Sequence, residues 1–459
     1  MTDKIDTPSN DYLNRVDDWA LCRDVISGSK AVKAAGEKYL PKVGSTQTAA
    51  SYASYKKRAF FYAATARTVS GYIGLIFRKD PAVILPPALQ ELVKTVTPQG
   101  HTLDDLLEEV VTEVVEVNYV GLLVDHPAIN PDITTLAQAR RSGVRPYISI
   151  YKAETIIGVE YAIVNGVRAI SRVRLQEDAK TIRELTLING IYNIIIWSKP
   201  TVSSGEFMPG EPSVPLANGQ PLGFIPFLLC SDEAVFSAPP LPLLNDLAEA
   251  NISHYQTSAD LDEGAHKTAL PTPWVTGEFE DNAAPAGLEI GGGMAWVLNG
   301  KSAQVGMLEY AGTGLAHLEK RADAKAAMMV TLGARILASE KASTESSETH
   351  SIKRAGENSV LASLARTVSR QITQALVWLS AWAGIAGDIS VELNVDFVPG
   401  EMTPQALTAW VSALQTGAIS QQTFFEALQS GEAISPAISF EDEQDRRAAT
   451  QADTPPTGI

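Results

Sequence analysis

Hydrophobic residues recur every three or four positions in two long segments of the chain, and this spacing predicts two helices. The first runs from Gly312 to Ile336 and the second from Ile352 to Trp382, where the apolar face is heavier. Small residues on the first apolar stripe would let a neighbouring helix approach closely. That stripe comprises Leu315, Leu318, Ala322, Ala326, Met329, Gly333 and Ile336.

A strongly polar stretch, Ser339 to Ser351, separates these two helices. Its Ser, Thr and charged residues compete for backbone hydrogen bonds and offer little to bury, so the pattern predicts a loop held between two rods. Such a loop either reaches into a cavity or channel, or is a long surface connection in a helical hairpin.

An alternation of period two from Tyr147 to Cys230 predicts an antiparallel sheet. Two dipeptides inside it, Asn165-Gly166 and Asn189-Gly190, lie between apolar runs and are typical of tight hairpin turns. A buried strand, Val117 to Val124, precedes this block. Because strands and helices occupy separate stretches of the sequence, the predicted class is α+β.

Both ends of the chain are predicted to be helical. Tyr12 to Phe77 is typical of a mainly helical region, and it includes a predicted helix from Tyr52 to Ile76. Near the other end, a strand from Ile389 to Val398 is followed by an acidic tail from Glu441 that we expect to be disordered. Two short helices are predicted between strand and tail, Pro404 to Gln415 and Gln421 to Gln429.

Two predicted helices carry acidic faces. The helix from Leu103 sets carboxylates opposite Leu and Val, and we interpret them as a solvated face because catalytic carboxylate pairs need distinct, partly desolvated environments. The helix from Leu243 to Gly264 contains no Lys or Arg. Its carboxylates are Asp246, Glu249, Asp260, Asp262 and Glu263.

The composition is that of a globular protein. With 459 residues, 45% of them hydrophobic, the chain is long enough for two or three domains. The N-terminus lacks the basic start and apolar run of a secretion signal, and the two cysteines, Cys22 and Cys230, are expected to be buried thiols. Gln371 to Gly387 carries no charge, but it continues an amphipathic helix, so we expect a core helix and no membrane span.

The formal net charge of −16 argues against a protein that grips nucleic acid through a broad basic face. It leaves room for one that lets DNA pass, because a wall of carboxylates repels phosphates and prevents sticking.

No motif indicates catalysis. Gly312-Thr313-Gly314 resembles the first turn of a dinucleotide-binding unit only superficially, because His317 takes the third glycine position. The run Gly291-Gly292-Gly293 lacks the residues that complete a phosphate-cradling loop, and no histidines are paired at metal-ligand spacing. We therefore expect no catalytic residue, metal or cofactor.

Three short segments of the sequence resemble tailed-bacteriophage portal proteins, the head-to-tail connectors of phage particles. The similarity covers residues from about 10 to 435. The three segments are Lys38-Tyr39-Leu40-Pro41-Lys42, Ile76-Phe77-Arg78-Lys79-Asp80-Pro81 and Ala269-Leu270-Pro271-Thr272-Pro273-Trp274. The order of predicted elements is also similar to that of this family.

The resemblance implies a portal-protein fold with an α/β wing, a helical stem, a small β-containing clip and a short helical crown. The polar stretch falls where portals carry the tunnel loop that projects toward DNA. The implied map is wing 1–238, stem helix 239–265, clip 266–311, second stem helix 312–338, tunnel loop 339–351, long wing helix and strand 352–400, crown helices 401–435 and disordered tail 436–459.

The resemblance further implies a non-enzymatic ring, typically a dodecamer, at one capsid vertex of the virion, assembled in the host cytoplasm. Double-stranded DNA would pass through it during packaging and ejection, and its partners would be the major capsid protein, the terminase large subunit and a head-tail adaptor. The tunnel-loop residues that the resemblance places near DNA are Lys341, Ser343, Thr344, Ser346, Ser347 and Lys353. The residues that it implies line the channel in the stem are the five carboxylates of the helix from Leu243. The clip residues that it implies are Trp274, Gly291, Gly292 and Gly293.

Two alternatives remain open from the sequence. One is a soluble hydrolase or nucleotide-dependent enzyme with an unrecognised active site. The turn at Gly312 is the sequence feature that most favours this alternative. The other is a capsid or tail adaptor that is not a portal. A monomer that binds nucleotide or turns over a substrate would favour the enzyme, whereas annular particles would favour the portal.

Overall fold

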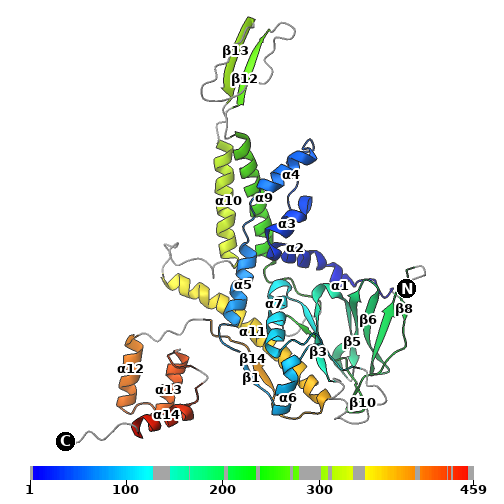
Figure 1. Ribbon diagram of the computed structural model, residues 1–459, viewed down its shortest axis with the longest axis vertical. Helices are drawn as coiled ribbons and strands as arrows, with labels where there is room; N and C mark the ends of the chain where they lie inside the picture. The colour runs from blue at the N-terminus through cyan, green and yellow to red at the C-terminus, as the bar shows by residue number, and fades with distance from the viewer. Residues whose placement is uncertain are drawn as a thin grey trace, which may run out of the picture. The chain divides into compact units, whose positions relative to one another are not determined.

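The computed structural model of the chain divides into two units, Met1–Asn394 and Val395–Ile459 (Figure 1). Helices and strands form separate blocks, and every described strand pair is antiparallel, so the predicted α+β class is confirmed. The structure describes residues 4–127, 145–164, 166–200, 205–233, 238–268, 272–278, 301–308, 313–333, 347–397, 404–431, 433–435 and 438–452.

The first unit begins with short helices, as predicted, but the predicted helix from Tyr52 to Ile76 is wrong. The chain leaves helical geometry at Ala59 (φ −50°, ψ 127°), which turns the Phe61 ring inward against Tyr255, with ring centroids 5.7 Å apart. Burying that ring outweighs helix continuity, and two helices result. The helices of this region are α1 (Asn10–Leu13), α2 (Val16–Ser27), α3 (Ser29–Ala34), η1 (Gly36–Lys38), α4 (Ala49–Arg58) and α5 (Ala64–Ile76).

The predicted antiparallel block is confirmed as a five-stranded sheet of order β4-β5-β6-β7-β8 and a three-stranded sheet of order β11-β2-β3. At the turn between β6 and β7, Asn189 and Gly190 have φ of 54° and 77°, the left-handed pair that a two-residue hairpin needs. Val164 pairs with Val167, so the other Asn-Gly hairpin is confirmed too. The strands are β2 (Val120–Asp125), β3 (Tyr147–Lys152), β4 (Ile156–Val164), β5 (Val167–Asp178), β6 (Thr181–Ile188), β7 (Ile191–Ser198), β8 (Met208–Pro209), β9 (Leu216–Ala217), β10 (Gln220–Pro221) and β11 (Phe227–Cys230), with η3 (Ala153–Thr155) between β3 and β4.

Two helices with strong apolar faces form the core beside this sheet. In α7 (Leu103–Val117) a capping box between Thr102 and Asp105 fixes the start. The helix α11 (Ser347–Ala383) packs against α7, β2 and β11. Its predicted apolar stripe is buried: Leu361, Leu364, Val368, Ile372, Leu376 and Leu379.

The start of α11 corrects the predicted polar loop, because Ser347 to Ser351 are helical and belong to α11. The predicted strand from Ile389 is also shorter than expected, because β14 (Ser390–Glu392) has only the three-residue β1 (Ala82–Ile84) to pair with. Between β1 and α7 lie α6 (Pro87–Leu92) and η2 (Val93–Thr95).

No helix within the described ranges is long and apolar enough to cross a membrane.

The second unit contains the two predicted short helices, α12 (Pro404–Gln415) and α13 (Gln421–Ser430). The expected disorder from Glu441 is wrong for α14 (Phe440–Ala452). Ser439 caps that helix by accepting from the backbone N–H of Asp442 at 3.0 Å, and the Phe440 ring packs against Phe425. A cap and an aromatic contact thus support the start of a helix in this acidic segment.

Candidate functional site: a helical stem and its anchorage

Two long helices, α9 (Asn245–Thr268) and α10 (Thr313–Thr331), lie side by side and antiparallel (Figure 1). At one end a Cβ on Gly264 would lie 2.7 Å from Leu315 Cδ2, and at the other a Cβ on Gly333 would lie 3.6 Å from Leu244 Cδ2. At about 1.5 Å per residue, α9 is about 36 Å long. Gly264 of α9, which lies outside the predicted stripe, thus lets Leu315 of α10 approach closely at one end of the pair.

The predicted stripe of α10 faces α9. Its described members are buried or half-buried, whereas Ala316, Ala324 and Met328 on the opposite side are exposed. Lys325 of α10 forms hydrogen bonds with α9: its ammonium donates to the carbonyl of Ser253 at 2.9 Å and to Thr257 Oγ1 at 2.6 Å. Burial, and then the charge of Arg321, lower the pKa of Lys325.

Another face of α9 is attached to the N-terminal helices through Asn251, which is fully buried. Its Oδ1 accepts from the backbone N–H and the hydroxyl of Thr65, at 3.2 and 3.1 Å, and its Nδ2 donates to the carbonyl of Tyr62 at 2.7 Å. The side chain thereby satisfies backbone groups that the break between α4 and α5 leaves without helical partners.

Two carboxylates of α9 are engaged by α4. The hydroxyl of Tyr55 donates to Asp260 at 2.7 Å, and Glu263, which is buried, forms ion pairs with Arg58 and Lys267. Burial alone would raise the pKa of Glu263, but its hydrogen bonds to these two cations outweigh burial and lower it.

The five stem carboxylates therefore differ in surroundings. Asp246 and Glu249 are exposed, and Glu249 accepts a hydrogen bond from Asn245 at 3.2 Å. Asp262 is half-exposed, whereas Asp260 and Glu263 make the contacts just described within the same chain. That all five line a channel stays a prediction.

The predicted clip contains a hairpin of β12 (Thr272–Glu278) and β13 (Lys301–Leu308), which follows α9 in the sequence and precedes α10. Trp274 pairs with Gly306, and a Cβ on that glycine would lie within 2.9 Å of the indole. The hairpin exposes Trp274, Val305 and Met307. Gly291, Gly292 and Gly293 lie outside the described residues.

The predicted tunnel-loop residues are divided by the start of α11. Lys341, Ser343, Thr344 and Ser346 lie outside the described residues, whereas Ser347 and Lys353 belong to α11. The strands described before α10 do not support the dinucleotide-binding interpretation of the Gly312 turn, because β13 pairs antiparallel with β12, whereas that interpretation needs a parallel βαβ unit.

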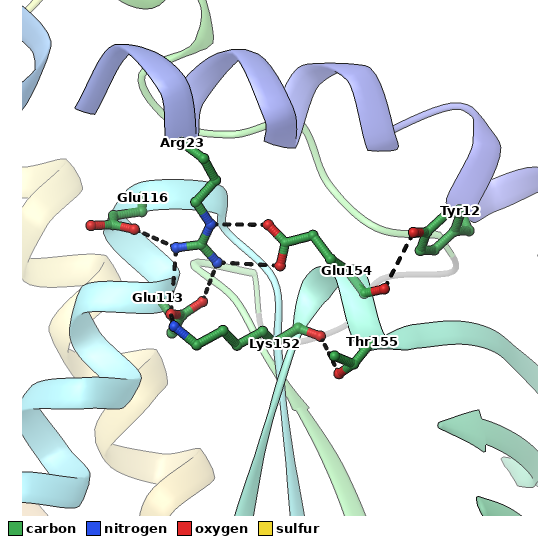
Figure 2. A network of polar contacts seen from close by, with 7 residues as sticks. All are labelled: Tyr12, Arg23, Glu113, Glu116, Lys152, Glu154 and Thr155. Carbon is green, nitrogen blue, oxygen red and sulfur yellow. Dashed lines mark hydrogen bonds and ion pairs between the residues drawn. The ribbon is translucent and has the colours of Figure 1, made fainter. Parts of the chain in front are cut away.

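Figure 2 shows a charged network that joins α2 to α7 and to the connection between β3 and β4, with Arg23 at its centre. The Arg23 guanidinium forms ion pairs with Glu113, Glu116 and Glu154, the last at 2.9 Å. Lys152 reaches Glu113 from the other side at 2.8 Å. Arg23 thus connects three segments, namely α2, α7 and the turn between β3 and β4.

The network sets the charge state of its members. Burial would lower the pKa of Arg23, but Glu154 and Glu113 outweigh burial and raise it. Burial would raise the pKa of Glu154, yet hydrogen bonding and charge from Arg23 lower it. For Glu116 burial prevails and the pKa is raised. The arginine is therefore permanently charged, and its carboxylates respond differently to acid.

This network was not predicted from the sequence, because the acidic side of the helix from Leu103 was interpreted as a solvated face. Glu113 is only 3% exposed, so that assignment is wrong for this residue. A signal was present: Val110, Glu113 and Val117 are three and four residues apart and fall on one helical stripe. A carboxylate between two core valines predicts a buried charge with a partner.

A metal site and a reactive cysteine each need a particular arrangement of side chains. No group of three or more His, Cys, Asp or Glu in these ranges is arranged to hold a metal ion. Cys22 and Cys230 are buried free thiols, as predicted, and burial raises the pKa of Cys22 to about 12, which keeps it protonated and a poor nucleophile.

Residues 242–383 match a family described as a domain of unknown function (DUF4055). The matched segment runs from just before α9 into the last turn of α11 and is less than half of the chain. No curated protein matches the chain.

Three solved chains resemble this one at low sequence identity. A chain from the neck of an empty GTA particle computed with C6 symmetry is 11% identical, with a TM-score of 0.44, over 80% of this chain and 90% of that one. A chain from the virion of a native gene transfer agent particle is 12% identical, with a TM-score of 0.42, over 85% and 96%. A chain from the native GTA neck computed with C12 symmetry is 12% identical, with a TM-score of 0.42, over 79% and 88%. With TM-scores this low, the function of this chain has to be argued from its own residues and topology.

Proposed function

We propose that this chain is the subunit of a portal-type ring, a non-enzymatic channel through which double-stranded DNA enters and leaves a phage-like particle. One observation carries the proposal: two long antiparallel helices are connected through a β-hairpin segment, and a third long helix then packs into an α/β body. That order is the one expected from the portal resemblance in the sequence.

The stem would wall the channel in this proposal. Closed cyclic symmetry requires that one surface of each subunit meets a different surface of the next. The exposed side of α10, with its small residues, is available for such a neighbour, while α9 is held by the N-terminal helices. A dodecamer would carry roughly −190 formal charges, twelve times −16, so DNA would slide without being gripped.

The remaining roles follow from the same proposal. The hairpin of β12 and β13 would meet the terminase large subunit during packaging and a head-tail adaptor afterwards, and the body would contact the major capsid protein. The segment before α11, with Lys341, would approach the DNA. ATP hydrolysis would come from the terminase, so the ring needs no cofactor and lies at a capsid vertex of the virion, after assembly in the host cytoplasm.

Deleting Thr344 to Ser347 tests this proposal. We expect rings to assemble as in wild type, because neither stem helix is touched, while packaged DNA falls to a small fraction of the wild-type amount. Ring assembly is measured by electron microscopy of purified protein, and packaging by nuclease-protected DNA in particles.

A four-residue deletion in the C-terminal tail, residues 454–457, is the matched control and should leave both measurements unchanged. Wild-type DNA content in the Thr344 to Ser347 deletion would contradict the loop's role. A purified wild-type chain that stays monomeric at every concentration, and is absent from particles, would contradict the portal proposal as a whole.

A further inference from the structure

A basic surface, which we define as Lys30, Lys33, Lys56 and Lys57, lies on α3 and α4. Residues 30–58 contain seven Lys or Arg and one acid, Glu37, in a chain whose net charge is −16. The ammonium of Lys33 donates to the carbonyl of Lys57 at 3.2 Å, so the two helices bring their lysines together. Positive charge is therefore concentrated in this segment of a chain that is negative as a whole.

The four lysines of the basic surface have no carboxylate within 4.0 Å among the described residues, unlike the other cations of this segment. Lys38 pairs with Asp24, Lys42 with Glu37, and Arg58 with Glu263. Lys30 and Lys57 are exposed, and Lys33 and Lys56 are half-exposed. Crowded like charges repel one another, so this surface is suited to an acidic partner.

An acidic surface, which we define as Asp105, Glu108 and Glu109, lies on the outer side of α7. It borders an open concavity of about 450 Å³ whose floor includes Glu113 and Glu116 of the charged network. The network's own three carboxylates already exceed its two cations, Arg23 and Lys152. The imidazole Nδ1 of His101 lies 3.7 Å from Glu109 Oε2.

We propose that the basic surface of one copy binds the acidic surface of the next copy, as part of the heterologous contact that closes the ring. This inference rests on the proposed ring. The two surfaces belong to one compact unit, so every copy presents both. A nucleic acid is the weaker candidate, because the rest of the chain is even more negative than −16 and repels phosphates.

Charge reversal with rescue tests the proposal on the full chain. We expect Lys30→Glu/Lys57→Glu, and separately Glu108→Lys/Glu109→Lys, to raise the protein concentration needed for half-assembly by about tenfold or more, because like charges then face each other across the contact. The chain that carries all four changes should assemble at nearly the wild-type concentration. Mass photometry at fixed salt measures the assembled fraction.

Lys94→Glu/Lys180→Glu is the matched control, since it reverses the same number of charges at exposed positions outside both surfaces, and it should assemble like wild type. Circular dichroism establishes that each variant is folded. Unchanged assembly of either reversal, or no recovery in the combined chain, would overturn the proposed contact.

The outcomes also separate this proposal from the proposed function. If rings persist in both reversals, the contact is wrong and the ring stands. If wild type never assembles, both fail. Salt-sensitive binding of a 60-base-pair duplex that Lys30→Glu/Lys57→Glu abolishes, with assembly unaltered, would assign the basic surface to DNA and overturn the contact between copies.

Discussion

Replacing Arg23 with Met is expected to lower the free energy of unfolding by about 3 kcal/mol, because it removes the ion-pair partner of two half-buried carboxylates and one of the two partners of the buried Glu113. Glu113 keeps Lys152, but Glu116 and Glu154 lose their ion pairs with Arg23, and Glu113 loses one of two. Urea unfolding followed by circular dichroism, at one protein concentration, measures the loss.

A pH series distinguishes lost charge pairing from lost packing in this variant. Without Arg23, burial raises the pKa of Glu116 and Glu154 above their unfolded values, so their contribution to stability is present at low pH and is lost as pH rises. In the wild-type protein the pKa of Glu154 is lowered, which has the opposite effect. The stability that ionised Glu154 contributes is lost as the pH falls through the pKa that it has in the folded protein. The difference between the two proteins should therefore shrink from about pH 7 to about pH 5.

Arg168→Met is the control, because Arg168 is exposed and stacks on Tyr161, with its guanidinium 4.1 Å from the ring centroid, and makes no ion pair among the described residues. It should change the free energy of unfolding by less than about 1 kcal/mol. An Arg23→Met variant that loses no more than this control, or whose loss does not vary with pH, would show that the network is not a structural anchor.

Replacing Asn251 with Leu is expected to lower the free energy of unfolding by about 2–4 kcal/mol. Leu has nearly the same volume, but it leaves the amide and hydroxyl of the buried Thr65 without their acceptor and removes one of the two hydrogen bonds to the carbonyl of Tyr62. Faster hydrogen exchange at the Thr65 amide should accompany the loss, because that N–H donates to Asn251 in the wild-type protein.

Gln256→Leu is the matched control on the same helix. Gln256 is half-buried and makes one hydrogen bond, to the carbonyl of Tyr39 at 3.0 Å, so the expected loss is about 1 kcal/mol or less. Equal losses in the two variants, or an unchanged exchange rate at Thr65, would contradict the role given to Asn251.

Local periodicity predicted most elements of this fold. The stripe on α10, the two Asn-Gly hairpins and the short helices α12 and α13 depend on neighbouring residues alone, so the sequence carries them directly. The single helix predicted across α4 and α5 failed because Phe61 is buried against Tyr255, which lies far away in the sequence. Propensity gave no information about that contact.

The candidate site was less accessible to sequence reasoning than the fold. The carboxylates of α9 could be identified from the sequence of that helix alone. Their partners Tyr55 and Arg58 lie on α4, so no pattern within α9 predicts these contacts. The basic surface was missed because net charge averages over the chain and hides the lysines between residues 30 and 58. Charge has to be examined segment by segment before a class of partner is excluded.

The attachment of α9 to the first helices has a consequence for biosynthesis. Tyr55 and Asp260 are 205 residues apart, so a ribosome must add about 200 residues before that contact can form. At the usual rate of about 5–20 residues per second, the nascent chain waits on the order of 10–40 s with its first aromatic residues uncovered. Chaperones that hold unfinished chains should therefore raise the soluble yield of this protein during its translation.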